Sequence, residues 1–213
     1  MTHTPDESPN SLKLQRVEQL IETLGEKSPT PGGGAVASIV GALGAALARM
    51  VVNYSIGKKK LAQHDELHQE AIERLGLFAE RALQLADDDA EAYGALNALM
   101  KLDKDDPKRI AAWEEAVDRA MTPPRETLGV CLGLLHLLEL LDDATSKMLR
   151  SDLMIAALLA ETGAQAAAIN VRINLTLLED ASKVQVIEME LCRMLDVAMR
   201  LKNAIVKGGK ASS

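Results

Sequence analysis

Segments rich in alanine and leucine, with apolar side chains three and four residues apart, cover most of the chain. Strand-forming residues are scarce, and aromatic residues make up only 2% of the 213 residues. Alanine and leucine favour helices, whereas β-branched and aromatic residues favour strands. We therefore predict an all-α protein that folds as a single multi-helical up-and-down bundle. The expected helices cover residues 11–26, 35–56, 65–100, 107–121, 125–141, 151–178 and 181–206.

The helical pattern runs through the chain without a linker or an internal repeat. We therefore predict one helical domain over residues 12–206, with disordered tails at 1–11 and 207–213. Pro123 and Pro124 fall inside a helical pattern. Because proline lacks the backbone N–H that a helix interior uses, we expect these two residues to break or kink the helix.

The charge of the chain limits its partners. The formal net charge is −7 and the isoelectric point is about 5.2. Nucleic acids and anionic membranes call for a basic face, so we expect neither as a partner.

The two cysteines, Cys131 and Cys192, lie far apart, which argues against a disulfide framework and favours a reducing compartment. The polar N-terminus has no apolar signal core, so we expect a cytoplasmic protein.

A glycine turn, Pro31-Gly32-Gly33-Gly34, precedes the second expected helix. It matches GxGxxA formally, but Ser-Pro-Thr-Pro stands where a dinucleotide-binding motif requires a strand, so we exclude that motif. Three glycines leave the N–H groups of a helix N-terminus open to an anion or a polarised carbonyl group. The alternative is a plain helix entry with no ligand.

Small residues recur every four positions along the second helix, as Gly34, Ser38, Ala42 on one line and Ala37, Gly41, Ala45 on another. Glycine inside a helix costs about 1 kcal/mol relative to alanine, so this pattern favours close packing of another helix. That helix belongs either to the same subunit or to a second copy.

Two charged triplets are candidates for binding or catalysis. Lys58-Lys59-Lys60 follows a helix end, where it either solvates that end or binds a carboxylate-rich or phosphorylated ligand. Asp87-Asp88-Asp89 lies within a helix, and successive residues there are about 100° apart, so at most one or two can face a cleft. Crowded carboxylates suit acid–base chemistry, and a solvated helix face is the alternative. No loop of alternating oxygen ligands is present, so we predict no metal site.

Asn170 and Asn174 lie four residues apart and share one face of a predicted helix. Paired amides on a packed helix need hydrogen-bond partners, either in a ligand or in a neighbouring helix.

His136 lies among leucines, where we expect a core or interface histidine rather than a catalytic one.

Several islands of sequence then occur in a distinctive order: Ser28–Ala37, Gly41–Leu47, Met50-Val51, Gly57–Lys60, Asp88–Tyr93, Ser151–Leu153 and Asn170–Leu175. Together they resemble the cyclodeaminase/cyclohydrolase family of folate enzymes over about residues 12–206. This family includes stand-alone methenyltetrahydrofolate cyclohydrolases and the cyclodeaminase domain of formimidoyltransferase-cyclodeaminase.

The resemblance implies an all-helical homodimer with a folate site near the subunit interface. The implied activity is the conversion of 5,10-methenyltetrahydrofolate and water to 10-formyltetrahydrofolate. Asp89 and Asp152 are the implied catalytic carboxylates, and Asp89 best matches the position that is acidic in both branches of the family. The implied substrate-binding residues are Lys58 and Lys59 for the glutamate tail, Gly32, Gly33 and Gly34 for the pterin, and Asn170 and Asn174 for its amide-like edge.

Two alternatives remain open. The chain is similar to the cyclodeaminase branch at Arg150–Leu153, so it is alternatively a formimidoyltetrahydrofolate cyclodeaminase that releases ammonia. A non-catalytic, folate-binding helical scaffold is the further alternative. We expect no metal and no cofactor beyond the tetrahydrofolate substrate, which carries one or several glutamates.

Overall fold

The computed structural model describes residues 11–207, and within them it contains helices and no strands, which confirms the all-α prediction. The α-helices are α1 (Val17–Gly25), α2 (Gly33–Asn53), α3 (Asp65–Met100), α4 (Pro107–Leu141), α5 (Arg150–Leu175) and α6 (Ala181–Lys207). Three short 3-10 helices, η1 (Leu12–Leu14), η2 (Lys59–His64) and η3 (Lys147–Leu149), lie between them or before them. Of the predicted tails 1–11 and 207–213, residues 1–10 and 208–213 lie outside the described residues, and Lys207 is the last residue of α6. The domain limits remain a prediction.

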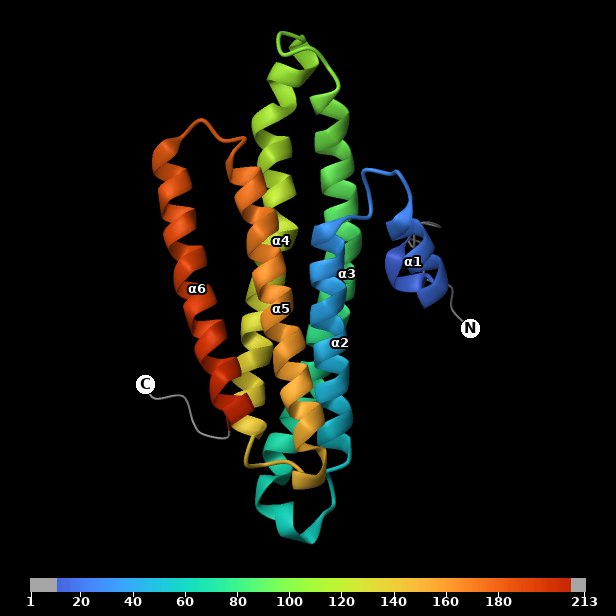
Figure 1. The fold of residues 1–213 in the computed structure, drawn as a ribbon, viewed down its shortest axis with the longest axis vertical. Coiled ribbons are helices and arrows are strands. Elements are labelled where there is room, and N and C mark those ends of the chain that lie inside the picture. The colour runs from blue at the N-terminus through green and yellow to red at the C-terminus, as the bar shows by residue number, and fades with distance from the viewer. Residues whose placement is uncertain (1–10, 208–213) are drawn as a thin grey trace.

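Four helices form the bundle, with α2 and α4 each packed against both α3 and α5 (Figure 1). Helix α6 lies on the outside against α5 and α4. Figure 1 also shows that α3 and α4 extend well beyond the N-terminal end of α2. The interior consists mainly of alanine and leucine, which lets long helices approach closely with few aromatic side chains.

Small residues set the closest contacts of the bundle. A Cβ atom on Gly41 would lie 3.0 Å from the Sγ atom of Cys131, and one on Gly163 would lie 2.9 Å from the same atom. Helices α2, α4 and α5 therefore meet around one buried thiol. Both small-residue lines of α2 are buried within the chain, so of the two alternatives they serve packing inside one subunit.

The prolines do not divide α4, which runs without a break from Pro107 to Leu141 and contains both Pro123 and Pro124. The prediction of two separate helices was wrong, because tertiary contacts compensate the backbone groups that proline leaves without partners. One such group is the carbonyl oxygen of Ala120, which accepts a hydrogen bond of 3.0 Å from Nδ2 of Asn174 on α5.

The N-terminal segment also differs from the predicted single helix over residues 11–26. It forms η1 and then α1, because the carboxylate of Asp87 on α3 binds its start. Ser11 Oγ donates to Asp87 Oδ2 at 2.6 Å, and the Leu12 N–H donates to Asp87 Oδ1 at 2.5 Å. Ser11, which we assigned to the tail, is therefore held on the bundle.

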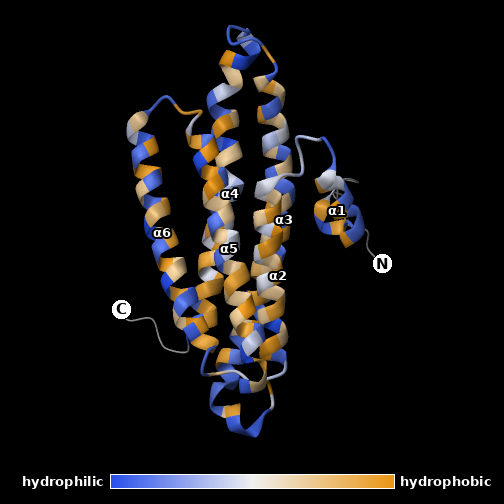
Figure 2. Ribbon diagram, viewed as in Figure 1, coloured by the Kyte–Doolittle hydropathy of each residue, from blue (hydrophilic) through white to orange (hydrophobic). Residues whose placement is uncertain are grey.

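Within residues 11–207, two helical stretches, Gly33–Asn53 and Lys147–Leu175, are long and apolar enough to cross a membrane by length and composition alone. Figure 2 shows that α2 is hydrophobic along most of its length. The core helices of an ordinary bundle have the same signature, and 56% of the apolar window of α2 is buried inside the chain. This observation by itself therefore does not indicate a membrane protein.

Candidate active site

Asp89 projects from the inner face of α3 onto the first turn of α2. It follows Leu85 by four residues and Ala82 by seven, and both of these side chains are fully buried. A Cβ atom on Gly34 would overlap the carboxylate of Asp89, so glycine at this position leaves room for the carboxylate where it lies. The glycine turn thus has a steric function that its sequence indicated only in part.

The environment of Asp89 changes its acidity. Burial raises its pKa from 3.8 to about 6, because the charged form loses its hydration. A hydrogen bond from the backbone N–H of Ala35 opposes this shift by stabilising the charged form. A carboxyl group with such a pKa exchanges a proton readily near neutral pH, which suits a general acid or base.

Asn170 of α5 faces the same glycine turn from the other side. The Cβ position of Gly33 lies 3.5 Å from both Nδ2 and Oδ1 of Asn170. Nδ2 donates to the carbonyl oxygen of Ala166 at 2.8 Å, which fixes the orientation of the amide. The structure therefore brings together Gly33, Gly34, Asp89 and Asn170, with Gly32 as the N-cap of α2.

The three consecutive aspartates point in different directions, which confirms that they cannot share a face. Asp87 binds the N-terminal segment. Asp88 accepts hydrogen bonds from Arg81 at 3.2 Å and from Gln84 at 2.9 Å. Only Asp89 reaches the glycine turn.

Three other predicted site residues, Lys58, Lys59 and Asp152, lie at the opposite end of the bundle. Lys58 and Lys59 follow the C-terminal end of α2, which has 21 residues and is therefore about 30 Å long. Asp152 lies in the first turn of α5, about 27 Å along that helix from Asn170. Within one chain, the structure therefore brings neither lysine and no second predicted carboxylate to Asp89.

A network of hydroxyl groups holds Lys58 at that end. Its Nζ atom donates to Ser146 Oγ at 2.7 Å, and the Ser146 N–H donates to Ser55 Oγ at 2.9 Å. Ser55 is fully buried. These hydrogen bonds therefore hold the Lys58 side chain in place at the edge of the bundle.

Two site neighbours escaped the sequence reasoning. Ser38 lies one turn below Gly34, where it donates to the Gly34 carbonyl oxygen at 3.2 Å and lies 2.7 Å from Oγ1 of Thr127 on α4. Its position on the small-residue line was a usable signal, whereas nothing in the sequence singled out Thr127. His136, expected in the core or at an interface, is exposed in the chain, so the core alternative was wrong.

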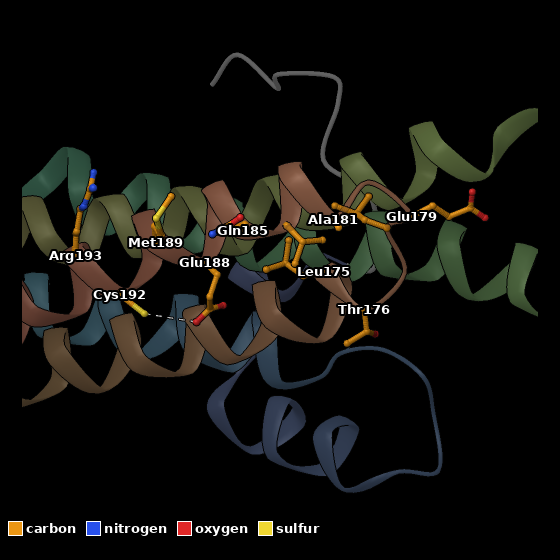
Figure 3. Close-up of a pocket in the computed structure, with 11 residues that line it drawn as sticks. Leu175, Thr176, Glu179, Ala181, Gln185, Glu188, Met189, Cys192 and Arg193 are labelled. Carbon is orange, nitrogen blue, oxygen red and sulfur yellow. Dashed lines mark hydrogen bonds between the residues drawn. The ribbon is translucent and has the colours of Figure 1, made fainter.

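A separate groove of about 750 Å³ lies between the end of α5 and α6 (Figure 3). Leu175, Val184 and Met189 line it, together with Glu188 and Cys192. Glu188 is paired with Arg172 of α5, which lowers the pKa of this carboxyl group. None of the predicted site residues lines the groove, so we do not place the chemistry there.

The described part of the chain contains no group of three or more His, Cys, Asp or Glu side chains arranged to hold a metal ion. The polar groups at the glycine turn are instead one half-buried carboxyl group, one amide and the backbone N–H groups of a helix N-terminus. This set can exchange protons and bind a polar, planar molecule.

Comparison with known proteins places these features in a family. The family model of formiminotransferase-cyclodeaminase matches residues 16–193. A methenyltetrahydrofolate cyclohydrolase of Methylorubrum extorquens is 32% identical over 170 residues, which cover 78% of this chain and 82% of that protein. A formimidoyltransferase-cyclodeaminase of Sus scrofa is 33% identical over 85% of this chain, which spans only 35% of that longer protein.

The fold has a solved counterpart. The crystal structure of formiminotetrahydrofolate cyclodeaminase from Thermotoga maritima superposes with a TM-score of 0.77 and 28% sequence identity. The match covers 92% of this chain and 93% of that one, so it includes all four bundle helices and most of what surrounds them.

Proposed function

This chain belongs to the formiminotransferase-cyclodeaminase family, and we propose that it is a methenyltetrahydrofolate cyclohydrolase. The proposed reaction converts 5,10-methenyltetrahydrofolate and water to 10-formyltetrahydrofolate. The similarity to the Methylorubrum extorquens cyclohydrolase supports this choice, because it extends over most of both chains.

One observation carries the proposal: the half-buried carboxyl group of Asp89 lies on the N-terminus of α2 with a pKa of about 6. In the proposed reaction, Asp89 accepts a proton from water as the water oxygen bonds to the electrophilic carbon of the methenyl bridge. The resulting tetrahedral adduct loses its hydroxyl proton to solvent as the carbonyl group forms. Asp89 returns its own proton to the departing ring nitrogen, the bond between carbon and that nitrogen breaks, and the formyl group remains on the other nitrogen.

The neighbours of Asp89 suit a flat, polar substrate. The glycine turn has no side chains to keep a ring away from the backbone N–H groups of α2. Oδ1 of Asn170 lies beside the turn, where it can accept a hydrogen bond from the amide-like edge of the pterin. The bridging carbon already belongs to a cationic amidinium group, so the proposed chemistry needs no Lewis acid, and we include neither a metal nor a further cofactor.

We also infer that the enzyme acts as a homodimer. Large apolar side chains are exposed along the outer faces of α2 and α5: Val36, Leu43, Ile155, Leu158, Ile169 and Ile173. A two-fold axis perpendicular to α2 would cover this apolar face and pack the two α2 helices antiparallel. It would also bring the end that carries Lys58 and Asp152 in one copy toward the glycine turn of the other, where the lysines could bind the glutamate tail.

The decisive experiment follows the loss of the methenyl chromophore by absorbance, above the uncatalysed background, with purified protein. We expect saturable turnover and formation of 10-formyltetrahydrofolate.

The similarity to the Thermotoga maritima cyclodeaminase supports a second candidate activity, which is tested in parallel by ammonia release from 5-formiminotetrahydrofolate. Ammonia release without methenyl turnover would transfer the assignment to cyclodeaminase, and folate binding without either reaction would favour a scaffold. We place the proposed enzyme in the cytoplasm, in keeping with its two unpaired cysteines.

A further inference from the structure

The two prolines of α4 leave one buried carbonyl group without a helical partner. The carbonyl oxygen of Ala120 would normally accept a hydrogen bond from residue 124, or from residue 123 in a tighter turn. Both of these residues are proline and have no N–H to donate. Ala120 is buried, so water does not replace the lost bond readily, and an unpaired carbonyl group there would destabilise the fold.

Asn174 supplies the missing partner from another helix. Its Nδ2 atom donates to the Ala120 carbonyl oxygen at 3.0 Å, and the side chain of Asn174 is itself buried. The contact joins α5 to α4 at the prolines. Because this nitrogen is already engaged with the backbone, the structure gives Asn174 a different partner from the substrate edge that the sequence resemblance implied.

This contact also affects the candidate site, because Asn174 lies close to Asn170 on α5. Asn174 lies one helical turn after Asn170, and the two share a face of α5. A hydrogen bond at Asn174 therefore fixes the rotation of α5 at the level where Asn170 meets Gly33. We propose that Asn174 is a positioning residue, which uses the carbonyl group exposed by Pro124 to aim Asn170 at the substrate.

This inference rests on the proposed function, since it assigns Asn170 to substrate binding. It predicts that stability and substrate binding respond differently to a second substitution, which a purely structural role does not predict. Replacing Pro124 with alanine restores an N–H that can bond to Ala120, so it compensates the stability lost at Asn174. It does not restore this hydrogen bond between α5 and α4, so Asn170 is held less firmly in place.

The test is a double-mutant cycle with Asn174→Ala, Pro124→Ala and the double variant, each measured for unfolding in denaturant and for KM and kcat. We expect Asn174→Ala to raise the unfolding equilibrium constant by roughly 10- to 100-fold, as for a buried carbonyl group that loses its partner. We expect the same change to raise KM about three- to tenfold, with little effect on kcat, because Asn170 would bind substrate and transition state alike.

In the double variant, stability should return to the level of Pro124→Ala alone while KM stays raised. If KM recovers together with stability, or if Asn174→Ala leaves KM unchanged, Asn174 serves stability only and the proposal is wrong. If Asn174→Ala alone does not fold, the comparison of the double variant with Pro124→Ala still gives the effect on KM. Asn203→Ala on α6 is the matched control and should change neither quantity, because its side chain accepts a hydrogen bond from the adjacent Lys202 and does not bond to another helix in the described part of the chain.

Failure of the proposed function would be recognised separately, as an absence of turnover by the unmodified protein. The dissociation constant of tetrahydrofolate then replaces KM in the same cycle. A raised dissociation constant in both Asn174 variants would support the positioning role, and an unchanged constant would overturn it.

Discussion

Asp89→Asn should remove most of the activity and make the protein more stable. The amide keeps the shape of the carboxyl group and an oxygen that can accept the Ala35 N–H, but it cannot exchange a proton near neutral pH. General acid–base groups typically contribute 10²- to 10⁴-fold, so we expect kcat to fall by about that factor. In the unmodified enzyme, kcat should fall as the pH decreases through about 6, where Asp89 becomes protonated.

The gain in stability follows from the sign of the pKa shift. The folded protein holds the pKa of Asp89 at about 6, above the ordinary value of 3.8 for an aspartate. The folded state therefore binds this proton more tightly than the unfolded state, so the stabilising contribution is complete below pH 3.8 and is lost as the pH rises through 6. The difference between a pKa of 3.8 and one of about 6 corresponds to roughly 3 kcal/mol of stability.

The asparagine variant avoids that loss, because it is neutral at every pH. We expect it to unfold about 6–12 °C higher than the unmodified protein at pH 8, and at nearly the same temperature at pH 4. Calorimetry at both pH values, at one fixed protein concentration, measures this difference. Stability would then be gained where function is lost, as in other active sites that hold a strained or desolvated group.

Two results would refute this reasoning. An Asp89→Asn variant that is no more stable at pH 8 would mean that burial does not raise this pKa. A folded variant with near-normal kcat would mean that Asp89 is not the proton carrier, and a loss of activity in Asp152→Asn would then transfer the role to Asp152. Asp87→Asn is the matched control and should change kcat little, because the amide oxygen can still accept the Leu12 N–H.

Three further outcomes follow from the arrangement of the helices. Sedimentation at micromolar concentration should give about twice the chain mass of 22.9 kDa, and a monomeric unmodified protein would contradict the dimer. Leu43→Asp should shift the protein to monomers, because this leucine is 56% exposed on the apolar face. Changing Lys58 and Lys59 to alanine should raise KM for a polyglutamylated substrate with little effect on kcat, and the effect should shrink at high salt; an unchanged KM would leave these lysines as a solvated helix end. Gly41→Leu should destabilise folding by about 1–3 kcal/mol in denaturant titrations, because the new side chain would meet the Cys131 thiol; loss of dimers without loss of stability would mean that Gly41 packs against a second copy.

The sequence by itself determined the helical class, the glycine turn and the resemblance to a folate enzyme family. These are local properties: helix propensity, a run of three glycines before a helix, and short motifs in a fixed order. Helical geometry also required the three aspartates to diverge, and the structure confirms this. The length of the second helix already implied that Lys58 lies far from Gly34, although we assigned both to one site.

Only the tertiary structure decided which way each side chain faces. The rotation of a helix within a bundle is set by packing against its neighbours. Helical periodicity therefore could not show that Asp89, rather than Asp87, reaches the first turn of α2, although the family resemblance singled out Asp89. Where α4 runs through its two prolines, an amide from α5, 54 residues away in sequence, binds the Ala120 carbonyl group. Proline removes a hydrogen bond locally, but whether the helix breaks depends on a partner that only the folded chain brings to the Ala120 carbonyl group.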